Sequence, residues 1–178
     1  IKNLLSDTDM LFITAGLGGG TGTGASPVIA KIAKEMDILT VGVVTKPFKW
    51  EGNERSSLAE QGLKDLEQYV DSLIVIPNDL LQSLGERITV FNAFDAANDV
   101  LLNSVQGIVE LITVPGVINL DFADVKAVMG KKGRSIMGSA VASGPDRARL
   151  AIENAVRSPL LEDINLEGAS GILLNVTV

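Results

Sequence analysis

The chain has 178 residues and a net charge of −7, and an acidic balance argues against a nucleic-acid partner, because binding to phosphate backbones requires clustered positive charge. The sequence contains neither Cys nor His, so it excludes disulfides, thiolate metal sites and imidazole as a general base. No apolar run approaches the roughly 18 residues of a membrane span, and no signal peptide is visible, so we expect a cytoplasmic protein without a direct membrane span.

Three short apolar runs separated by two helix-like segments make up the first part of the chain. The runs 10–14 (MLFIT), 39–45 (LTVGVVT) and 73–76 (LIVI) predict buried parallel strands. Ser26 and Pro27 predict the start of the first helix, as N-cap and first-turn residues. The apolar faces predicted for the two helices are Val28, Ile29, Ile32, Ala33 and Met36, and Leu58, Gly62, Leu63, Leu66 and Val70. This alternation predicts an α/β fold with a parallel, Rossmann-like sheet.

A long helical segment follows over residues 90–113. Its apolar positions are Phe91, Phe94, Leu101, Leu102, Val105, Ile108, Val109 and Ile112. They occur around most of the circumference, so we expect this helix to be largely buried. The remainder predicts helices over 123–129 and 147–156 and strands over 135–142 and 171–178, which indicates the start of a second, α+β domain. Because the chain begins without Met and ends in a strand-like run, we expect it to be an internal piece of a longer protein.

The strongest local signal is the glycine-rich run 18–24 (GGGTGTG), between the first strand and the first helix. Glycines let the backbone approach an anion closely, and the free N–H groups at a helix N-terminus point toward it. The P-loop pattern fits six positions but then requires Lys where the chain has Ala25. The dinucleotide pattern fits Gly20, Gly22 and Ala25, but the first acid after the second strand is Glu51, inside a loop. The run therefore predicts a phosphate-binding loop, although it matches both the P-loop pattern and the dinucleotide-binding pattern only in part.

Further polar and aromatic residues could contact a nucleotide. Glu51 can accept hydrogen bonds from ribose hydroxyls and Arg55 can donate to phosphate or base, although an i,i+4 surface ion pair explains the same spacing. Phe94 can stack on a purine and Asn98 can pair with its polar edge, although the sequence alone favours ordinary core for Phe94. Asn78 follows the third strand, where ligands gather in parallel sheets.

These segments together resemble the tubulin/FtsZ family. The run 18–24 is similar to the family signature GGGTG[ST]G, with Thr23 as in the bacterial form. The other matching segments are 45–48 (TKPF) with 51–52 (EG) and Arg55, then 76–79 (IPND), 94–98 (FxxxN) and 119–124 (NxDFAD). The resemblance extends over essentially the whole chain, and it implies a tubulin/FtsZ GTPase fold. It implies that 1–88 form the second half of the GTP-binding domain, 89–115 a connecting helix, and 116–178 the synergy loop and the first part of a truncated C-terminal domain.

The resemblance implies GTP as ligand and substrate, with Mg²⁺ held mainly through the nucleotide phosphates. The implied GTP-binding residues are Gly18, Gly19, Gly20, Thr21, Gly22, Thr23, Gly24, Glu51, Arg55, Asn78, Phe94 and Asn98. It further implies that Asp121 and Asp124 polarise the water that attacks the γ-phosphate and that Asn119 helps to place this water. From the residues alone, Asp121 is equally consistent with a helix N-cap.

The length of the predicted long helix separates the two groups of site residues. About 24 residues extend roughly 36 Å, with Phe94 and Asn98 at the beginning and Asp121 and Asp124 just past the end. One molecule cannot bring both groups to the same nucleotide, so we expect subunits to stack head to tail. Such a contact generates a filament if it does not close.

As its partners, the resemblance implies copies of itself in the ring that divides a bacterial cell at mid-cell. It also implies division proteins and membrane adaptors bound through a tail absent from this chain. Two other interpretations are an oxidoreductase, based on Gly20, Gly22 and Ala25, and a binding module without activity. Family members carry another glycine-rich loop ahead of these residues, so we expect the chain alone to bind GTP poorly and not to polymerise. The 119–124 pattern disfavours eukaryotic tubulin and leaves plastid and archaeal members open.

Overall fold

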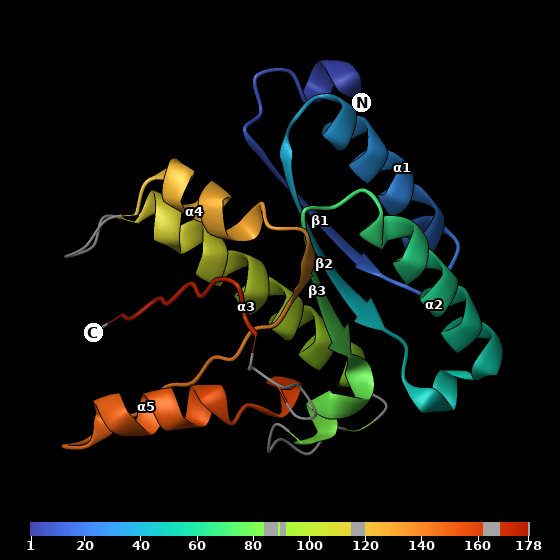
Figure 1. Cartoon of the computed structure of the whole chain (residues 1–178). Coiled ribbons are helices and arrows are strands. Elements are labelled where there is room, and N and C mark those ends of the chain that lie inside the picture. The colour runs from blue at the N-terminus through green and yellow to red at the C-terminus, as the bar shows by residue number, and fades with distance from the viewer. Residues whose placement is uncertain (84–88, 90–91, 115–119, 162–167, 178) are drawn as a thin grey trace.

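The computed structural model contains a four-stranded parallel sheet with helices on both faces (Figure 1). It describes residues 1–83, 89, 92–114, 120–161 and 168–177. The strands are β1 (Met10–Gly16), β2 (Leu39–Lys46), β3 (Ser72–Pro77) and β4 (Gly133–Ser135), which lie in that order across the sheet. Neighbouring strands pair in parallel throughout, so the predicted α/β fold with a parallel sheet is confirmed.

The register aligns the carboxyl ends of the first three strands. Gly16 lies beside Thr45, and Thr45 lies beside Ile76. All three strands predicted in this region are present, and each runs one to two residues longer than its apolar run. Residues 39–45 of β2 are buried without alternation, because helices cover both faces of the sheet.

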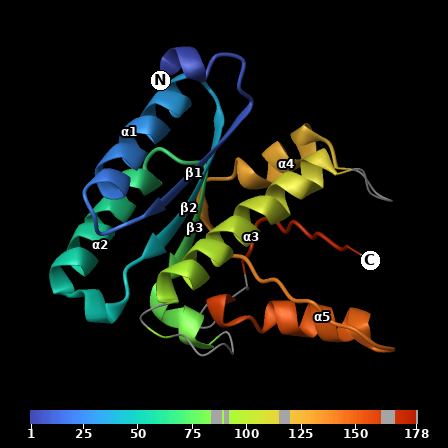
Figure 2. The ribbon, with the colours of Figure 1, turned by 180° about the vertical axis from the view of Figure 1, so that it is seen from behind.

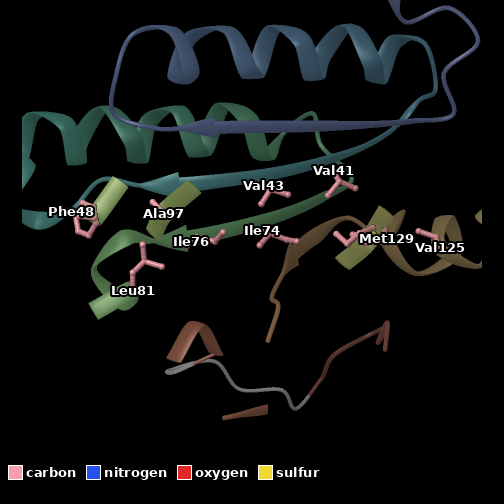
Figure 3. Close-up of a cluster of buried hydrophobic side chains, with 11 residues drawn as sticks. Val41, Val43, Phe48, Ile74, Ile76, Leu81, Ala97, Val125 and Met129 are labelled. Atoms are coloured by element: carbon pink, nitrogen blue, oxygen red, sulfur yellow. The ribbon is translucent and has the colours of Figure 1, made fainter. Parts of the chain in front are cut away.

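Helices α1 (Thr21–Glu35) and α2 (Asn53–Glu67) cover one face of the sheet, and α3 (Ala93–Thr113) covers the other (Figures 1 and 2). Each face has its own hydrophobic cluster. The first includes Ile13, Ala30, Val44, Ala59, Leu63, Leu66 and Leu73. The second includes Val41, Val43, Phe48, Ile74, Ile76, Leu81, Ala97, Val125 and Met129 (Figure 3). Alternate side chains of β2 point to opposite faces and thereby join both clusters.

The predicted start of the first helix was wrong. Helix α1 begins at Thr21, after Gly20 at the N-cap, so Ser26 and Pro27 lie inside it. The glycine-rich residues form the first turn even though their helix propensity is low, because tertiary packing overrides propensity. The predicted apolar face is right at Ala33, which is buried, and wrong at Val28, which is 56% exposed; Ser26 and Ala30 are buried without having been predicted.

Helix α3 has 21 residues and is buried on one side only, which corrects the expectation that it is buried around most of its circumference. Its buried residues are Ala93, Ala97, Ser104 and Ile108. Phe94 and Leu102 are 49% and 61% exposed, because the described part of the chain packs the sheet against a single face of α3. The predicted position Phe91 lies outside the described residues.

The C-terminal part follows the prediction for its helices and departs from it for its strands. Helices α4 (Phe122–Met129) and α5 (Arg147–Val156) are present. Of the strand predicted over 135–142, only Ser135 belongs to β4, and residues 171–177 form no strand. A strand needs a partner for its hydrogen-bond ladder, and none lies beside these segments among the described residues. Short 3₁₀ helices complete the chain: η1 (Lys2–Leu4), η2 (Lys49–Glu51), η3 (Asn78–Ser83) and η4 (Pro159–Leu161).

Candidate functional site

A cavity of about 230 Å³ opens at the carboxyl ends of β1, β2 and β3, beside the start of α3. Its walls are formed by Gly16, Leu17, Gly19, Thr45, Pro47, Glu51, Arg55, Asn78, Phe94, Ala97, Asn98 and Leu101. The predicted site residues among them are Gly19, Glu51, Arg55, Asn78, Phe94 and Asn98. The cavity lies where open parallel sheets bind ligands, outside the carboxyl ends of their strands.

The glycine-rich loop borders this cavity mainly through Gly19. Gly18 has a φ of +100°, and a Cβ there would lie 2.8 Å from the Arg55 carbonyl oxygen, so glycine is required. Gly22 is also needed, because a Cβ would lie 2.5 Å from the carbonyl oxygen of Gly16. The other predicted loop residues are Gly20, at the N-cap of α1, and Thr21, Thr23 and Gly24, in its first turn.

The first turn of α1 presents free backbone donors. The N–H groups of Thr21, Gly22 and Thr23 have no carbonyl one turn earlier within the helix. The hydrogen bond from Gly24 N–H to the Gly20 carbonyl, 3.0 Å, is the first of the helix. These N–H groups and the helix dipole favour an anion at this end of α1.

Glu51 and Arg55 form the ion pair that their spacing allows, and both line the cavity. Arg55 Nη1 lies 2.9 Å from Glu51 Oε2, and Phe48 N–H donates to Glu51 Oε1 at 2.8 Å. The Glu51 side chain is only 7% exposed, so these two donors compensate the burial of its charge. The ion pair and a ligand contact are thus compatible explanations of the same spacing.

Asn78 buries an amide oxygen in the cavity wall. The residue is 4% exposed, and its Oδ1 has no hydrogen-bond partner among the described residues. Leaving a buried acceptor unpaired costs about 1–3 kcal/mol, and such groups are rare in folded proteins. The Asn78 oxygen is therefore suited to accept a hydrogen bond from a bound ligand.

Three aromatic rings meet beside the cavity, and Phe94 is the one that lines it. Phe48 and Trp50 are stacked with ring centroids 5.0 Å apart, and Phe94 meets both edge-on at 6.0 and 5.9 Å. Phe94 is half exposed and lines the cavity, so it is not ordinary core. Sequence reasoning missed Trp50, although this single Trp of the chain directly precedes Glu51.

Sequence reasoning also missed apolar residues that do line the cavity. Ala97 and Leu101 lie three and seven residues after Phe94 in α3, and that spacing places them on the same helix face.

The end of β2 bears on the oxidoreductase interpretation. A dinucleotide site would have an acid there, whereas this strand ends at Lys46, which is paired with Glu60. The oxidoreductase interpretation therefore gains no support from this site.

The two predicted acids lie away from the cavity. Asp121 is the N-cap of α4, and its Oδ1 accepts a hydrogen bond from Asp124 N–H at 2.9 Å. Asp124 Oδ2 accepts in turn from Asp121 N–H at 3.4 Å, which completes a capping box. The capping interpretation of Asp121 is thus confirmed. The third predicted catalytic residue, Asn119, lies outside the described residues.

Helix α3 runs between the cavity and the acids. Its 21 residues extend about 32 Å, with the cavity at its first turns and α4 beside its other end (Figures 1 and 2). Figure 3 shows the same separation in the core, where Met129 and Val125 of α4 lie at the opposite end of the cluster from Phe48. The expected separation of the two predicted groups within one molecule is thus present.

Within the described part of the chain, no group of three or more acidic residues is arranged to hold a metal ion. None of the helices described is both long enough and apolar enough to cross a membrane.

The fold and the cavity define a Rossmann-like α/β protein with a glycine-rich loop at the carboxyl ends of its strands. Residues 1–86 match the GTPase domain of the tubulin/FtsZ family, and residues 133–178 match the C-terminal domain of the FtsZ family. The cell division protein FtsZ of Coxiella burnetii is 60% identical over 178 residues, which cover 99% of this chain and 46% of the relative. FtsZ of Pseudomonas aeruginosa is 56% identical, with 45% of its length covered.

Solved structures agree with these relatives. An empty FtsZ dimer of M. jannaschii superposes with a TM-score of 0.86 at 45% identity, covering 93% of this chain and 53% of that one. CetZ2 of Haloferax volcanii, solved as a GTPγS-bound protofilament, gives a TM-score of 0.60 at 28% identity, covering 78% and 40%. The chain belongs to the FtsZ family, and it spans about half the length of the curated relatives it matches.

Proposed function

We propose that the protein binds and hydrolyses GTP as the subunit of a cytoskeletal filament that directs bacterial cell division, with each active site shared between two head-to-tail subunits. The observation that carries this proposal is the position of the nucleotide-type cavity and of Asp121 and Asp124 at opposite ends of α3. A relative supports it, because CetZ2 of Haloferax volcanii was solved as a protofilament with a bound GTP analogue.

The cavity residues suit the parts of a guanine nucleotide. Phe94 offers a half-exposed ring for stacking on the base, and the unpaired Asn78 oxygen can accept from the N–H donors of guanine. Asn98 adds a second amide at the same wall. Glu51, which also lines the cavity, would accept hydrogen bonds from ribose hydroxyls, and Arg55 would donate to phosphate or base. The phosphates would extend toward Gly18, Gly19, Gly20, Thr21, Gly22, Thr23 and Gly24 at the N-terminus of α1.

The acids at α4 would act on a neighbour's nucleotide. In the capping box Asp121 uses Oδ1 and Asp124 uses Oδ2, so each carboxylate keeps another oxygen for a water proton. Both residues are exposed at the molecular surface. Phosphoryl transfer depends mainly on positioning and charge stabilisation, so carboxylates that orient the attacking water suffice without His. Asn119 would help to place this water. Mg²⁺, held mainly through the phosphates, would neutralise their charge.

The remaining parts of the proposal follow from the family. Residues 1–88 would form the second half of a GTP-binding domain, and residues 89–115 would form the helix that connects it to the C-terminal domain. Residues 116–178 would form the synergy loop and the first part of that C-terminal domain. The filament would form in the cytoplasm at the division site, and division proteins and membrane adaptors would bind through a tail outside this chain. The 178 residues alone would bind GTP weakly.

A mixing experiment in the complete protein tests the shared site. One partner carries Asp121→Asn, which keeps a good N-cap and removes the charge; the other carries Phe94→Ala with Asn98→Ala and cannot bind the base. Each should be inactive alone. In an equal mixture, roughly one junction in four pairs a bound nucleotide with intact acids, so GTP hydrolysis should recover partly. A mixture that stays as inactive as its two components would refute the shared site.

A further inference from the structure

Helices α1 and α2 approach each other closely at Thr23 and Gly62. A Cβ at Gly62 would lie 2.4 Å from Thr23 Cγ2 and 3.5 Å from Thr23 Cβ. Gly62 is buried in the interior of α2, where glycine lowers helix stability relative to alanine. The close contact with the Thr23 methyl group gives a reason for glycine at this position.

The other branch of the Thr23 side chain holds the glycine-rich loop. Thr23 Oγ1 accepts a hydrogen bond from Gly18 N–H at 2.9 Å. Gly18 has a φ of +100°, and the Arg55 carbonyl oxygen and Pro47 Cγ lie 2.8 and 3.3 Å from the position of its absent Cβ. The backbone of Gly18 is thus enclosed by Thr23 of α1 and by Arg55 of α2. Gly19, the next residue, lines the cavity.

We propose that Gly62 is a positioning residue for the glycine-rich loop and acts through Thr23. The space at Gly62 accommodates the Thr23 methyl group, and this rotamer aims the hydroxyl at Gly18 N–H. A β-branched side chain has few χ1 rotamers, so moving the methyl also moves the hydroxyl. The packing of α2 therefore sets the conformation of Gly18 and the position of Gly19 in the cavity wall. The expected effect on nucleotide binding rests on the proposed function, whereas the effect on the loop does not.

Gly62→Ala in the complete protein tests the contact. The added methyl should displace the Thr23 side chain, so the Gly18 amide should exchange hydrogen at least about tenfold faster. GTP affinity should fall at least about tenfold, while affinity for guanosine, which lacks phosphates, should change less than about twofold. Gly107→Ala is the matched control, because Gly107 also lies inside a helix but has no atom within 4 Å of an added Cβ.

Two substitutions at Thr23 separate its methyl from its hydroxyl. Adding Thr23→Ser to Gly62→Ala removes the clashing methyl group and keeps the hydroxyl acceptor. The exchange rate of the Gly18 amide and the GTP affinity should then return to within about threefold of their values in Thr23→Ser alone. Thr23→Val keeps the shape and loses the acceptor. The Gly18 amide should then exchange as fast as in Gly62→Ala.

Gly62→Ala alone could fail to fold, and the double variant with Thr23→Ser then provides the test. Because Thr23→Ser removes the clashing methyl group, thermal unfolding of the double variant should show a folded protein. The proposal is wrong if the Gly18 amide of Gly62→Ala exchanges as slowly as in the unaltered protein. It is also wrong if adding Thr23→Ser to Gly62→Ala leaves Gly18 exchange and GTP affinity as they are in Gly62→Ala alone. If the unaltered protein binds no GTP, the proposed function fails. Amide exchange at Gly18 still decides the role of Gly62.

Discussion

Asn78 combines deep burial with an amide oxygen that no described residue satisfies. Such an atom destabilises the unliganded protein, because the buried oxygen has lost its water without gaining a partner. A ligand that donates a hydrogen bond would recover this cost. The residue is thus less suited to the stability of the free chain than to ligand binding.

Substitution of Asn78 by leucine should separate the two effects. The free energy of unfolding without nucleotide should stay the same or rise by up to about 1 kcal/mol, because the unpaired oxygen is removed. GTP affinity should fall at least about tenfold, since the base loses an acceptor. Urea unfolding and GTP titration measure the two quantities. Asn103→Leu, at an exposed position of α3, is the control, and Asn78→Leu with undiminished GTP affinity would contradict the proposed contact.

At the residue scale, sequence patterns predicted the polar residues of the cavity better than its apolar ones. Asn78 and Glu51 follow strand ends, where polar side chains near a glycine-rich run indicate a ligand. Trp50 and Leu101 carry no such signal, because an aromatic or aliphatic residue in an apolar pattern is usually core. Only the fold shows that Leu101 lines the cavity and that Trp50 packs against Phe94, which lines it too.

At the element scale, the strands that were predicted correctly have partners nearby in the sequence. The runs behind β1, β2 and β3 are apolar, and each pairs with a neighbour across one helical crossover. The prediction over 171–178 failed for residues 171–177, which are also largely apolar but have no partner strand among the described residues. The start of α1 was mispredicted because Pro27 is typical of a first turn, whereas the glycine-rich residues before it already form the helix.

An ion pair joins the end of β2 to α2, next to the candidate site. Lys46 lies at the carboxyl end of β2 and pairs with Glu60 of α2. The hydrogen bond from Lys46, together with its charge, lowers the pKa of Glu60 from the usual 4.5, and partial desolvation opposes this shift. Arg134 and Lys64 lower the pKa further. The pair thus favours the ionised form of Glu60 in the folded state.

The sign of the pKa shift sets the pH dependence of stability. A carboxyl group with a lowered pKa in the folded state stabilises the protein above its unfolded pKa, and this contribution is lost as pH falls through the folded pKa. Glu60→Gln should therefore lower the free energy of unfolding by about 0.3 kcal/mol at pH 7, a small value because both side chains are partly solvated. Urea unfolding should show the difference vanish at acidic pH and shrink in 1 M salt. An equal loss at all pH values would exclude the ion pair as its cause.

At the scale of the whole molecule, the two halves of the candidate site lie at opposite ends of α3. The cavity and the first turn of α2 lie at one end, and α4 with Asp121 and Asp124 lies at the other (Figure 1). This polarity follows from the length of α3, which was predictable to within three residues from its apolar pattern. The course of the chain after α4 was not predictable, because it depends on long-range partners rather than on local composition.

Cross-linking between introduced cysteines should reveal head-to-tail assembly, since the chain has no Cys of its own. Glu54→Cys marks the cavity end and Ala123→Cys marks α4, both at exposed positions. With GTP and a short bifunctional thiol reagent, the double variant of the complete protein should form a ladder of multimers in a denaturing gel. Each single variant should give no product larger than a dimer, because a heterologous contact joins two different surfaces. A circularised monomer as the main product would mean that the two ends lie together in one molecule, which contradicts the shared site.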